Sequence, residues 1–288
     1  TPAGFTHRRL SAGALIRAML RALAEGDPSF RRGFFGQSAS NTLQRLADWL
    51  GVGDWLPAGE TPTLVIADAA WLSRLPFAAL PLPDGRSLGE RAILRYAPSL
   101  NIAAVSLDRD NTPATRALAI APLAFEGRHP ELPASLAEAA AVAGIWPGAV
   151  SLTGENATLG ALRALSAGGA LASFDLLYLG THAASNPARI RMSALALRDG
   201  DLTLQELLSW RLSARLVCLS ACDSAFAVSW GGEERVGIET ALLAAGARNI
   251  LSARWPVEDG ATTRIMDVFL RRYAGHGDAG LALFETRR

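Results

Sequence analysis

The chain has 288 residues, of which 50% are hydrophobic and 19% are charged, and its formal net charge is +1. All 28 Lys+Arg positions are arginine, which excludes Schiff-base chemistry and the phosphate-binding loop of Walker type, because both need a lysine. The balanced charge argues against nucleic-acid binding, since contacts to phosphates normally leave a basic excess on one face.

The sequence favours a protein of a reducing compartment. No apolar run of about 18 residues lacks a charge, so no membrane span is predicted. The first residues, TPAGFTHRRL, lack the pattern of a signal peptide. The only two cysteines, Cys218 and Cys222, cannot build a disulfide framework, and we expect a cytoplasmic protein.

The N-terminal part of the chain predicts helices. Residues 10–25 read as a helix that ends before Gly26. Residues 41–50 place leucines on one helical face, with Asn41 as the expected N-cap. We therefore expect a short helical N-terminal region over residues 1–58 and a second domain over residues 59–288.

Strands and helices then alternate. Apolar stretches predict strands at 63–68, 92–98, 116–125, 149–154, 174–183, 214–222 and 248–257. We expect the strand at 63–68 to be buried. Helical patterns lie at 132–145, 156–168, 204–209, 236–247 and 261–275, and residues 193–204 resemble a hairpin. Continuous apolar strands separated by helices indicate a mainly parallel sheet that is covered on both faces.

Two reactive side chains follow predicted strands directly. His182 comes after LLYLGT and Cys222 comes after LVCLSA. Ligand sites of open parallel sheets gather at the carboxyl ends of strands, and a thiol beside an imidazole provides the minimum parts of a cysteine hydrolase. From the residues alone, a structural role for either side chain stays open.

The remaining cysteine and histidines have plainer interpretations. Cys218 lies in the middle of its apolar strand, between Val217 and Leu219, and we expect it to be a buried packing residue. His7, His129 and His276 lie in polar or glycine-rich surroundings, and we expect them on the solvated surface.

Most of the chain resembles the CHAT domain, a family of caspase-like cysteine peptidases related to separases. The resemblance rests on LLYLGTHA, LVCLSACDSA, and GGEERVGIETALLAAGARNILSARWPVED, with TLVIADAAWLSRLPFAAL as the lead-in. It covers residues 40–288 approximately. It implies a caspase-like three-layer α/β/α sandwich with a mainly parallel central sheet, and it implies neither a cofactor nor a metal ion.

The resemblance also implies catalytic roles. Cys222 corresponds to the nucleophile of the family, and His182 to the histidine that protonates the leaving amine. The backbone N–H groups of Cys222 and Ala183 would hold the oxyanion, and such donors are typically worth about 3 kcal/mol each. The family usually shows His-Gly, whereas Ala183 follows the histidine here, and we expect weakened or retuned activity from this difference.

The candidates for substrate binding lie in two segments. Trp255, Val257 and Asp259 match the W-x-V-x-D motif of CHAT domains and separases, and Asp259 could select a P1 arginine. Alternatively, Asp259 caps a helix that starts near Ala261. The other substrate-binding candidates are Asp223, Trp230 and Arg254. The segment 225–235 either helps to form the substrate cleft or is an ordinary connection.

A metal site is not expected from the acidic residues of the second half of the chain. Asp199, Asp201 and Glu206 lie close together in the sequence, but a DGD sequence after a strand is typical of a tight turn.

We therefore expect a cysteine endopeptidase that acts on a protein substrate through Cys222 and His182, under the control of a regulatory protein partner or an activation signal. The alternative is a catalytically weak or inactive interaction module. Ala183 after the histidine, and the apolar helix at 10–25 as a docking element, favour this alternative.

Overall fold

The computed structural model describes two compact units. The described residues are 39–57, 61–67, 75–99, 101–103, 111–184, 186, 189–221, 227–229, 235–253 and 259–288. The first unit comprises Thr1–Tyr96 and Arg287, and the second comprises Ala97–Thr286 and Arg288. The domain boundary expected after residue 58 stays a prediction, and the helix expected at 10–25 lies outside the described residues.

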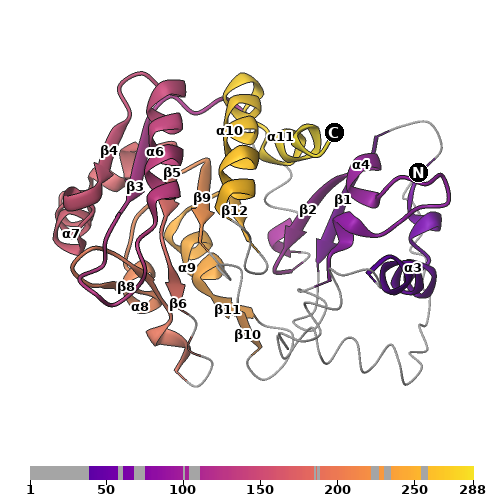
Figure 1. The fold of residues 1–288 in the computed structure, drawn as a ribbon, viewed down its shortest axis with the longest axis horizontal. Helices are drawn as coiled ribbons and strands as arrows, with labels where there is room; N and C mark the ends of the chain where they lie inside the picture. Colours follow the sequence, from indigo (N-terminus) through magenta and orange to yellow (C-terminus); the bar gives the residue numbers. More distant parts are fainter. Residues whose placement is uncertain are drawn as a thin grey trace. The chain divides into compact units, whose positions relative to one another are not determined.

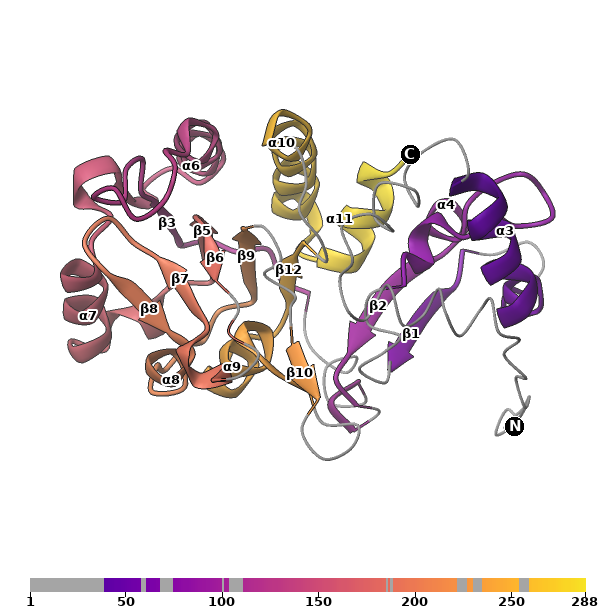
Figure 2. The ribbon, with the colours of Figure 1, turned by 60° about the horizontal axis from the view of Figure 1, so that its bottom comes forward.

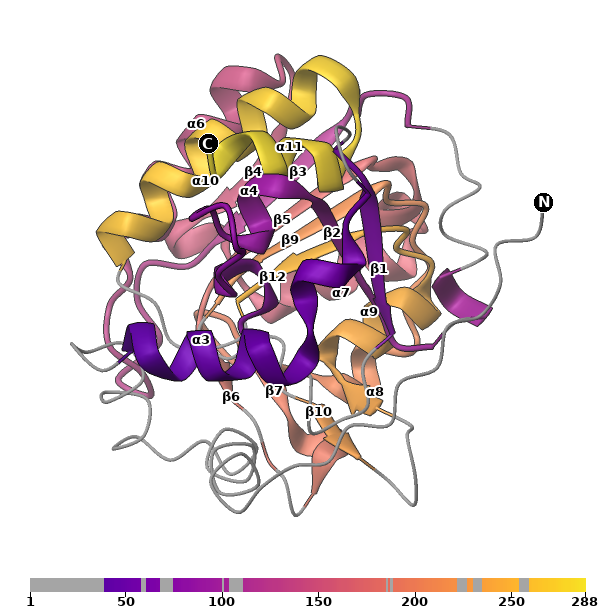
Figure 3. The ribbon, with the colours of Figure 1, turned by 90° about the vertical axis from the view of Figure 1, so that its right-hand side faces the viewer.

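The first unit pairs a small sheet with an amphipathic helix. Its elements are α3 (Ala39–Leu50), β1 (Thr63–Ala67), α4 (Leu88–Arg91) and β2 (Ile93–Ala97), with 3₁₀ turns at Val52–Trp55 and Phe77–Ala79. β1 and β2 form a two-stranded sheet and lie side by side in Figure 3. Leu46 and Leu50, which share one face of α3, pack in a core with Leu94 of β2.

Two expectations for this unit are wrong. α3 begins at Ala39, so Asn41 lies inside the first turn of the helix and is not its cap. β1 is only half-buried, with both end residues exposed, because a two-stranded sheet covers a strand less well than a larger sheet does.

The second unit is built on a five-stranded sheet. Its strands are β3 (Ala117–Ala121), β4 (Val150–Thr153), β5 (Leu176–Gly180), β9 (Leu216–Ser220) and β12 (Ile250–Ser252). Their order is β12-β9-β5-β3-β4, and every neighbouring pair is parallel (Figure 1). The expected mainly parallel sheet is confirmed.

Helices cover both faces of this sheet, as Figure 2 shows. α6 (Pro133–Ile145) and α10 (Asp259–His276) lie on one face, and α11 (Ala279–Thr286) packs beside α10. α7 (Leu159–Ala167), α8 (Leu204–Leu207) and α9 (Ile238–Ala245) lie on the other face. The arrangement is the expected caspase-like α/β/α sandwich, although no helix was expected at the position of α11.

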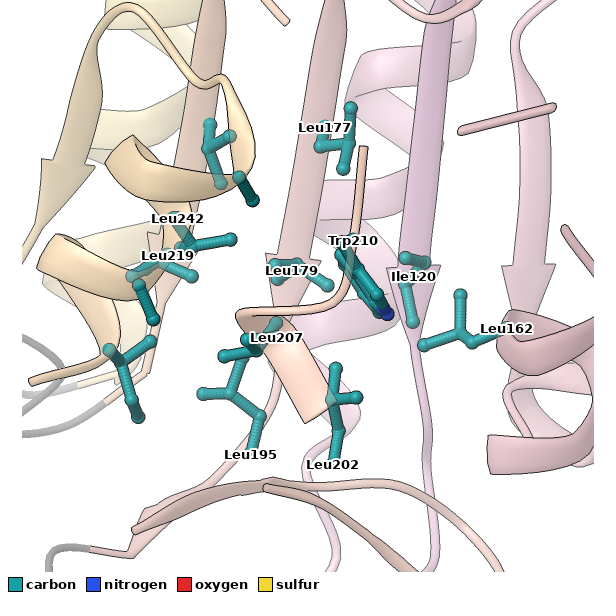
Figure 4. Close-up of a cluster of buried hydrophobic side chains, with 14 of the residues drawn as sticks. Ile120, Leu162, Leu177, Leu179, Leu195, Leu202, Leu207, Trp210, Leu219 and Leu242 are labelled. Carbon is teal, nitrogen blue, oxygen red and sulfur yellow. The ribbon is translucent and has the colours of Figure 1, made fainter. Parts of the chain in front are cut away.

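Strand side chains alternate between the two faces, so each face has its own core. Toward α7, α8 and α9 the strands direct large aliphatic side chains. In Figure 4 these meet the side chains of the helices and of the hairpin formed by β7 (Ala194–Ala196) and β8 (Asp201–Thr203). The labelled side chains of this core are Ile120, Leu162, Leu177, Leu179, Leu195, Leu202, Leu207, Trp210, Leu219 and Leu242. Toward α6 and α10, β3 presents only Ala117, Ala119 and Ala121.

The face toward α6 and α10 also holds polar groups. The buried carboxylate of Glu138 on α6 accepts hydrogen bonds from the hydroxyl of Tyr178 and from Thr263 Oγ1, the latter at 2.9 Å. Cys218 is fully buried on this face, as expected for a packing residue, and it is a free cysteine. Burial raises the pKa of the Cys218 thiol, and the charge of Glu138 raises it further.

Two smaller sheets complete the unit. β6 (Ala183–Ala184), β7 (Ala194–Ala196) and β8 (Asp201–Thr203) pair antiparallel in that order, so the expected hairpin is confirmed. β10 (Ala227–Ser229) pairs antiparallel with β11 (Arg235–Gly237). Among the described residues, no helix is long and apolar enough to cross a bilayer.

Asp175 joins three strands at the start of β5. Its Oδ2 accepts hydrogen bonds from the backbone N–H and the hydroxyl of Thr115 (2.9 and 2.8 Å) and from Arg116 N (3.1 Å). Arg215, which precedes β9, places its Nε 3.5 Å from Oδ1. Burial alone would raise the pKa of this carboxyl group, but the hydrogen bonds and Arg215 outweigh burial, so its pKa is lowered.

The first prediction concerns Asp175→Asn, which removes the charge. We expect the free energy of unfolding at pH 7 to fall by about 1–3 kcal/mol. A carboxyl group with a lowered folded-state pKa stabilises the protein above its unfolded pKa, and this stabilisation is lost as the pH falls through the folded value. The difference between wild type and variant should therefore shrink below about pH 3.8, the ordinary pKa of an aspartate.

Urea denaturation at pH 7 and at pH 3 measures this difference. Asp267→Asn is the matched control, because Asp267 pairs along α10 with Arg271, at 3.0 Å on the surface. Such an exposed pair contributes about 0.5 kcal/mol or less. An Asp175→Asn difference that is the same at both pH values would contradict the argument.

Candidate active site

The site is built on the carboxyl ends of β5 and β9, which are neighbours in the sheet (Figure 1). Their last paired residues are Gly180 and Ser220, and Thr181 N donates to the Ser220 carbonyl at 3.2 Å just beyond. In the sequence, His182 and Cys222 each come two residues after this pair. The structure describes His182, whereas Cys222 lies outside the described residues.

The main chain around His182 is held by β7. Ala196 N donates to the His182 carbonyl at 2.9 Å, and the buried Thr181 hydroxyl donates to the Ala196 carbonyl. This pattern makes Ala183 and Leu195 a non-hydrogen-bonded pair, which directs the Ala183 N–H away from β7. Ala183 is extended in β6, a conformation that alanine adopts without strain.

The imidazole ring of His182 is half-buried against the loop between β3 and α6, which we call the β3–α6 loop (residues 122–132). The ring centroid lies 4.8 Å from that of Phe125 and 5.2 Å from that of His129, and the two imidazoles are stacked. His182 Nε2 lies 2.8 Å from the Pro130 carbonyl oxygen. The expectation that His129 is a solvated surface residue is wrong, because its ring is half-buried in this stack.

The contact with Pro130 determines the tautomer of His182. A carbonyl oxygen only accepts hydrogen bonds, so Nε2 must carry the proton that is donated to Pro130. In the neutral ring, Nδ1 then keeps the lone pair and is the nitrogen that can take up a proton.

A tight turn shapes the β3–α6 loop. Arg128 N donates to the Phe125 carbonyl at 3.0 Å, and the two central residues, Glu126 and Gly127, have φ values of 51° and 78°. Positive φ at both central positions is the pattern of a type I′ turn. Because Glu126 is not a glycine, this conformation costs of order 1 kcal/mol, which the contacts of the turn must offset.

Most of the predicted substrate-binding residues lie outside the described part of the chain. These are Asp223, Trp230, Arg254 and Trp255. Asp259 is the first residue of α10, so the helix begins two residues before the expected start at Ala261. The segment 225–235 is described only where it forms β10 and the start of β11.

The acidic residues near the β7–β8 turn are engaged separately. Asp199 Oδ1 accepts from Leu159 N at 2.6 Å, at the start of α7. Asp201 and Glu206 form ion pairs with two different arginines. Within the described residues, no three His, Cys, Asp or Glu side chains are grouped so that they could hold a metal ion.

His276 also departs from its expected place on the solvated surface. It is half-buried at the end of α10, where its Nδ1 accepts from Asp278 N at 3.1 Å and its Nε2 lies 3.4 Å from a carboxylate oxygen of Glu285. His7 lies outside the described residues.

The sequence interpretation missed the residues of the β3–α6 loop that surround His182. Phe125 ends a predicted strand and His129 and Pro130 follow it, but all three lie more than 50 positions before His182. Their signal was the parallel sheet itself: β3 is the neighbour of β5, so the loop after β3 emerges at the same edge.

Fold and site geometry together define a caspase-like α/β protein with a histidine at the carboxyl end of a central strand. The family model of the CHAT domain matches residues 40–288. The chain therefore belongs to the CHAT domain family, which is related to the caspase-like cysteine peptidases. A search of curated proteins finds no match.

The second prediction concerns the stack of His129 on His182. His129→Ala removes the ring and should lower the free energy of unfolding by about 0.5–1.5 kcal/mol, the usual worth of an aromatic pair. His129→Phe keeps an aromatic ring and should stay within about 0.5 kcal/mol of wild type. Urea denaturation measures both, and equal losses in the two variants would show that stacking is not what His129 contributes.

Proposed function

We propose that the protein is a cysteine endopeptidase that cleaves a protein substrate with Cys222 as the nucleophile and His182 as the acid–base group. One observation carries the proposal. β5 and β9 are adjacent and parallel with Gly180 opposite Ser220, and the two reactive residues follow this pair at equal distances in the sequence. Membership of the CHAT family supports the same pairing.

The contact of His182 with Pro130 supports an acid–base role for this ring. With the proton of the neutral ring on Nε2, Nδ1 can accept the proton of the thiol, and the ring then becomes an imidazolium. The thiolate attacks the scissile carbonyl carbon and forms a tetrahedral adduct. The adduct collapses to a thioester as the C–N bond breaks, and Nδ1–H gives its proton to the leaving amine.

Hydrolysis of the thioester completes the cycle. His182 Nδ1 takes a proton from water, and the resulting hydroxide adds to the thioester carbonyl carbon. The C–S bond then breaks to release the acid, and Nδ1–H returns its proton to the thiolate of Cys222. In both steps the oxyanion is held by the N–H groups of Ala183 and Cys222. The direction of the Ala183 N–H away from β7 supports this role for Ala183, because that N–H is not used in the ladder.

We also infer a reducing, cytoplasmic setting and the involvement of a regulatory partner. Cys218 is buried and free, and Cys222 must stay a thiol to act. The setting rests on this use of cysteine. A regulatory partner is proposed from the family resemblance.

The third prediction tests the dyad. Cleavage of a peptide library identifies a good substrate, and kcat/KM is then compared among variants of the full chain. Cys222→Ala and His182→Ala should each lower kcat/KM by about 10³-fold or more, because the nucleophile and its base act as a unit.

Cys218→Ala is the matched control, because it removes the other thiol of the chain, which is fully buried in β9, four residues before Cys222. It should lower stability while kcat/KM stays within about twofold of wild type. Equal cleavage by wild type and Cys222→Ala would reject the peptidase assignment.

We propose Asp259 as a determinant of specificity for a P1 arginine, through a charge-assisted pair with the guanidinium group. Its place as the first residue of α10 offers another role, since a carboxylate at a helix N-terminus stabilises the helix. Asp223, Trp230, Arg254 and Trp255 are proposed to line the same substrate cleft.

The fourth prediction separates the two roles of Asp259. In Asp259→Asn, the preference for arginine over norleucine at P1 should fall about 10- to 100-fold, as expected when a charged hydrogen bond is lost. Paired peptides that differ only at P1 measure the ratio of kcat/KM. An unchanged ratio with a small loss of thermal stability would leave Asp259 as a helix-end residue only.

A non-catalytic interaction module is the alternative, and Ala183 in place of glycine is what favours it. Labelling with a peptidyl electrophile at neutral pH distinguishes the two. A peptidase labels at Cys222 in a manner that depends on His182, whereas a module leaves this thiol unlabelled and binds a partner stoichiometrically.

A further inference from the structure

Arg128 fixes the β3–α6 loop to the turn between β7 and β8. Its Nη2 donates to the carbonyl oxygens of Leu197 (2.5 Å), Arg198 (3.1 Å) and Gly200 (3.5 Å). Its Nη1 lies 2.5 Å from Asp201 Oδ1. The guanidinium group therefore joins the β3–α6 loop to three main-chain carbonyl oxygens and one carboxylate at the β7–β8 turn.

The same hairpin also holds the main chain of His182. Ala196, the last residue of β7, donates to the His182 carbonyl, and its own carbonyl accepts from Thr181. Leu197 follows directly and is the first acceptor of Arg128. The β7–β8 hairpin thus binds both the backbone of His182 and the loop that contacts its ring.

The path from Arg128 to the ring of His182 is short. Pro130, whose carbonyl oxygen accepts from Nε2, comes two residues after Arg128 in the chain. On the other side of Arg128, the turn residue Glu126 places Oε1 3.5 Å from Nη1 of Arg198, so a second contact joins the same two turns.

We propose that Arg128 is a positioning residue for His182: by fixing the β3–α6 loop to the β7–β8 turn, it holds the Pro130 carbonyl at the Nε2–H of His182. The proposal rests on the proposed peptidase function for its kinetic consequence. Its structural consequence, the single tautomer of His182, does not depend on activity.

The chemistry of arginine suits this role. A guanidinium group has five N–H donors in a rigid fork, so it can serve Asp201 and several carbonyl oxygens together. A lysine ammonium is a compact point charge with three donors and cannot span the same acceptors. Arg128→Lys should therefore keep part of the function of Arg128, whereas Arg128→Ala should keep none.

Arg163→Ala is the matched control. Arg163 pairs with Glu206 on α8, just after the same hairpin, through two bonds of 2.8 and 3.0 Å, and neither bond involves the β3–α6 loop. Asp201→Asn is a graded test, because it removes the ion pair of Arg128 and leaves its carbonyl acceptors in place.

The fifth prediction has two readouts, both taken where circular dichroism shows every variant to be folded. Steady-state kinetics of Arg128→Ala should give a kcat about tenfold lower with KM within about twofold, since misplacement of a catalytic group affects the chemical step. Arg128→Lys and Asp201→Asn should lie between wild type and Arg128→Ala, and the control Arg163→Ala should match wild type. The second readout is ¹⁵N NMR of histidine rings, with His182 assigned from the spectrum of His182→Ala.

In wild type and in Arg163→Ala we expect the neutral ring of His182 to show the Nε2–H tautomer, and in Arg128→Ala an average of the two tautomers. Arg128→Ala with the wild-type tautomer and the wild-type kcat would overturn the proposal. If neither wild type nor any variant cleaves, but the single Nε2–H tautomer of His182 is lost in Arg128→Ala, the positioning role stands and the peptidase function fails.

Discussion

The parallel pairing of β5 with β9 is the constraint on which the candidate site depends. Gly180 lies opposite Ser220, so both strands end at the same edge of the sheet, each two residues before His182 or Cys222 in the sequence. The pairing is secured at the far end of the strands by Asp175, whose carbonyl oxygen accepts from Arg215 N and Leu216 N. A slip of one residue would exchange the two faces of the strand and bury the wrong side chains, so the two cores keep this register.

His182 is held at its backbone and at its ring, and both sets of contacts depend on the β7–β8 hairpin. β7 fixes its backbone, and the β3–α6 loop fixes its ring through Phe125, His129 and Pro130. An imidazole on a strand end would otherwise turn about its side-chain torsions and exchange tautomers. The surrounding contacts leave one orientation, and the cost of ordering the ring is met when the domain folds and not when a substrate binds.

Much of the second unit could be predicted from the sequence, because β3, β5 and β9 are continuous apolar runs and alanine- and leucine-rich segments that favour helices lie between them. The half-exposed state of β1 could not be predicted, since it depends on the number of strands in its sheet. His182 was found because it follows a strand. His129 and Arg128 were missed, because ring stacking and bonds to main-chain carbonyls join residues distant in the chain and leave no periodic pattern.

The turn at Glu126 and Gly127 has a consequence for how this domain can change in length. Phe125 and His129 both contact the ring of His182, and they are separated only by the turn and by Arg128. Surface loops usually tolerate insertions well, because closing a longer loop costs little entropy. The β3–α6 loop differs, because residues on both sides of its turn contact the same ring. One added residue would move either the ring of His129 or the Pro130 carbonyl away from the imidazole of His182. Insertions are therefore better tolerated elsewhere in the chain, and loop length between β3 and α6 becomes a feature by which relatives with the same arrangement around the histidine can be recognised.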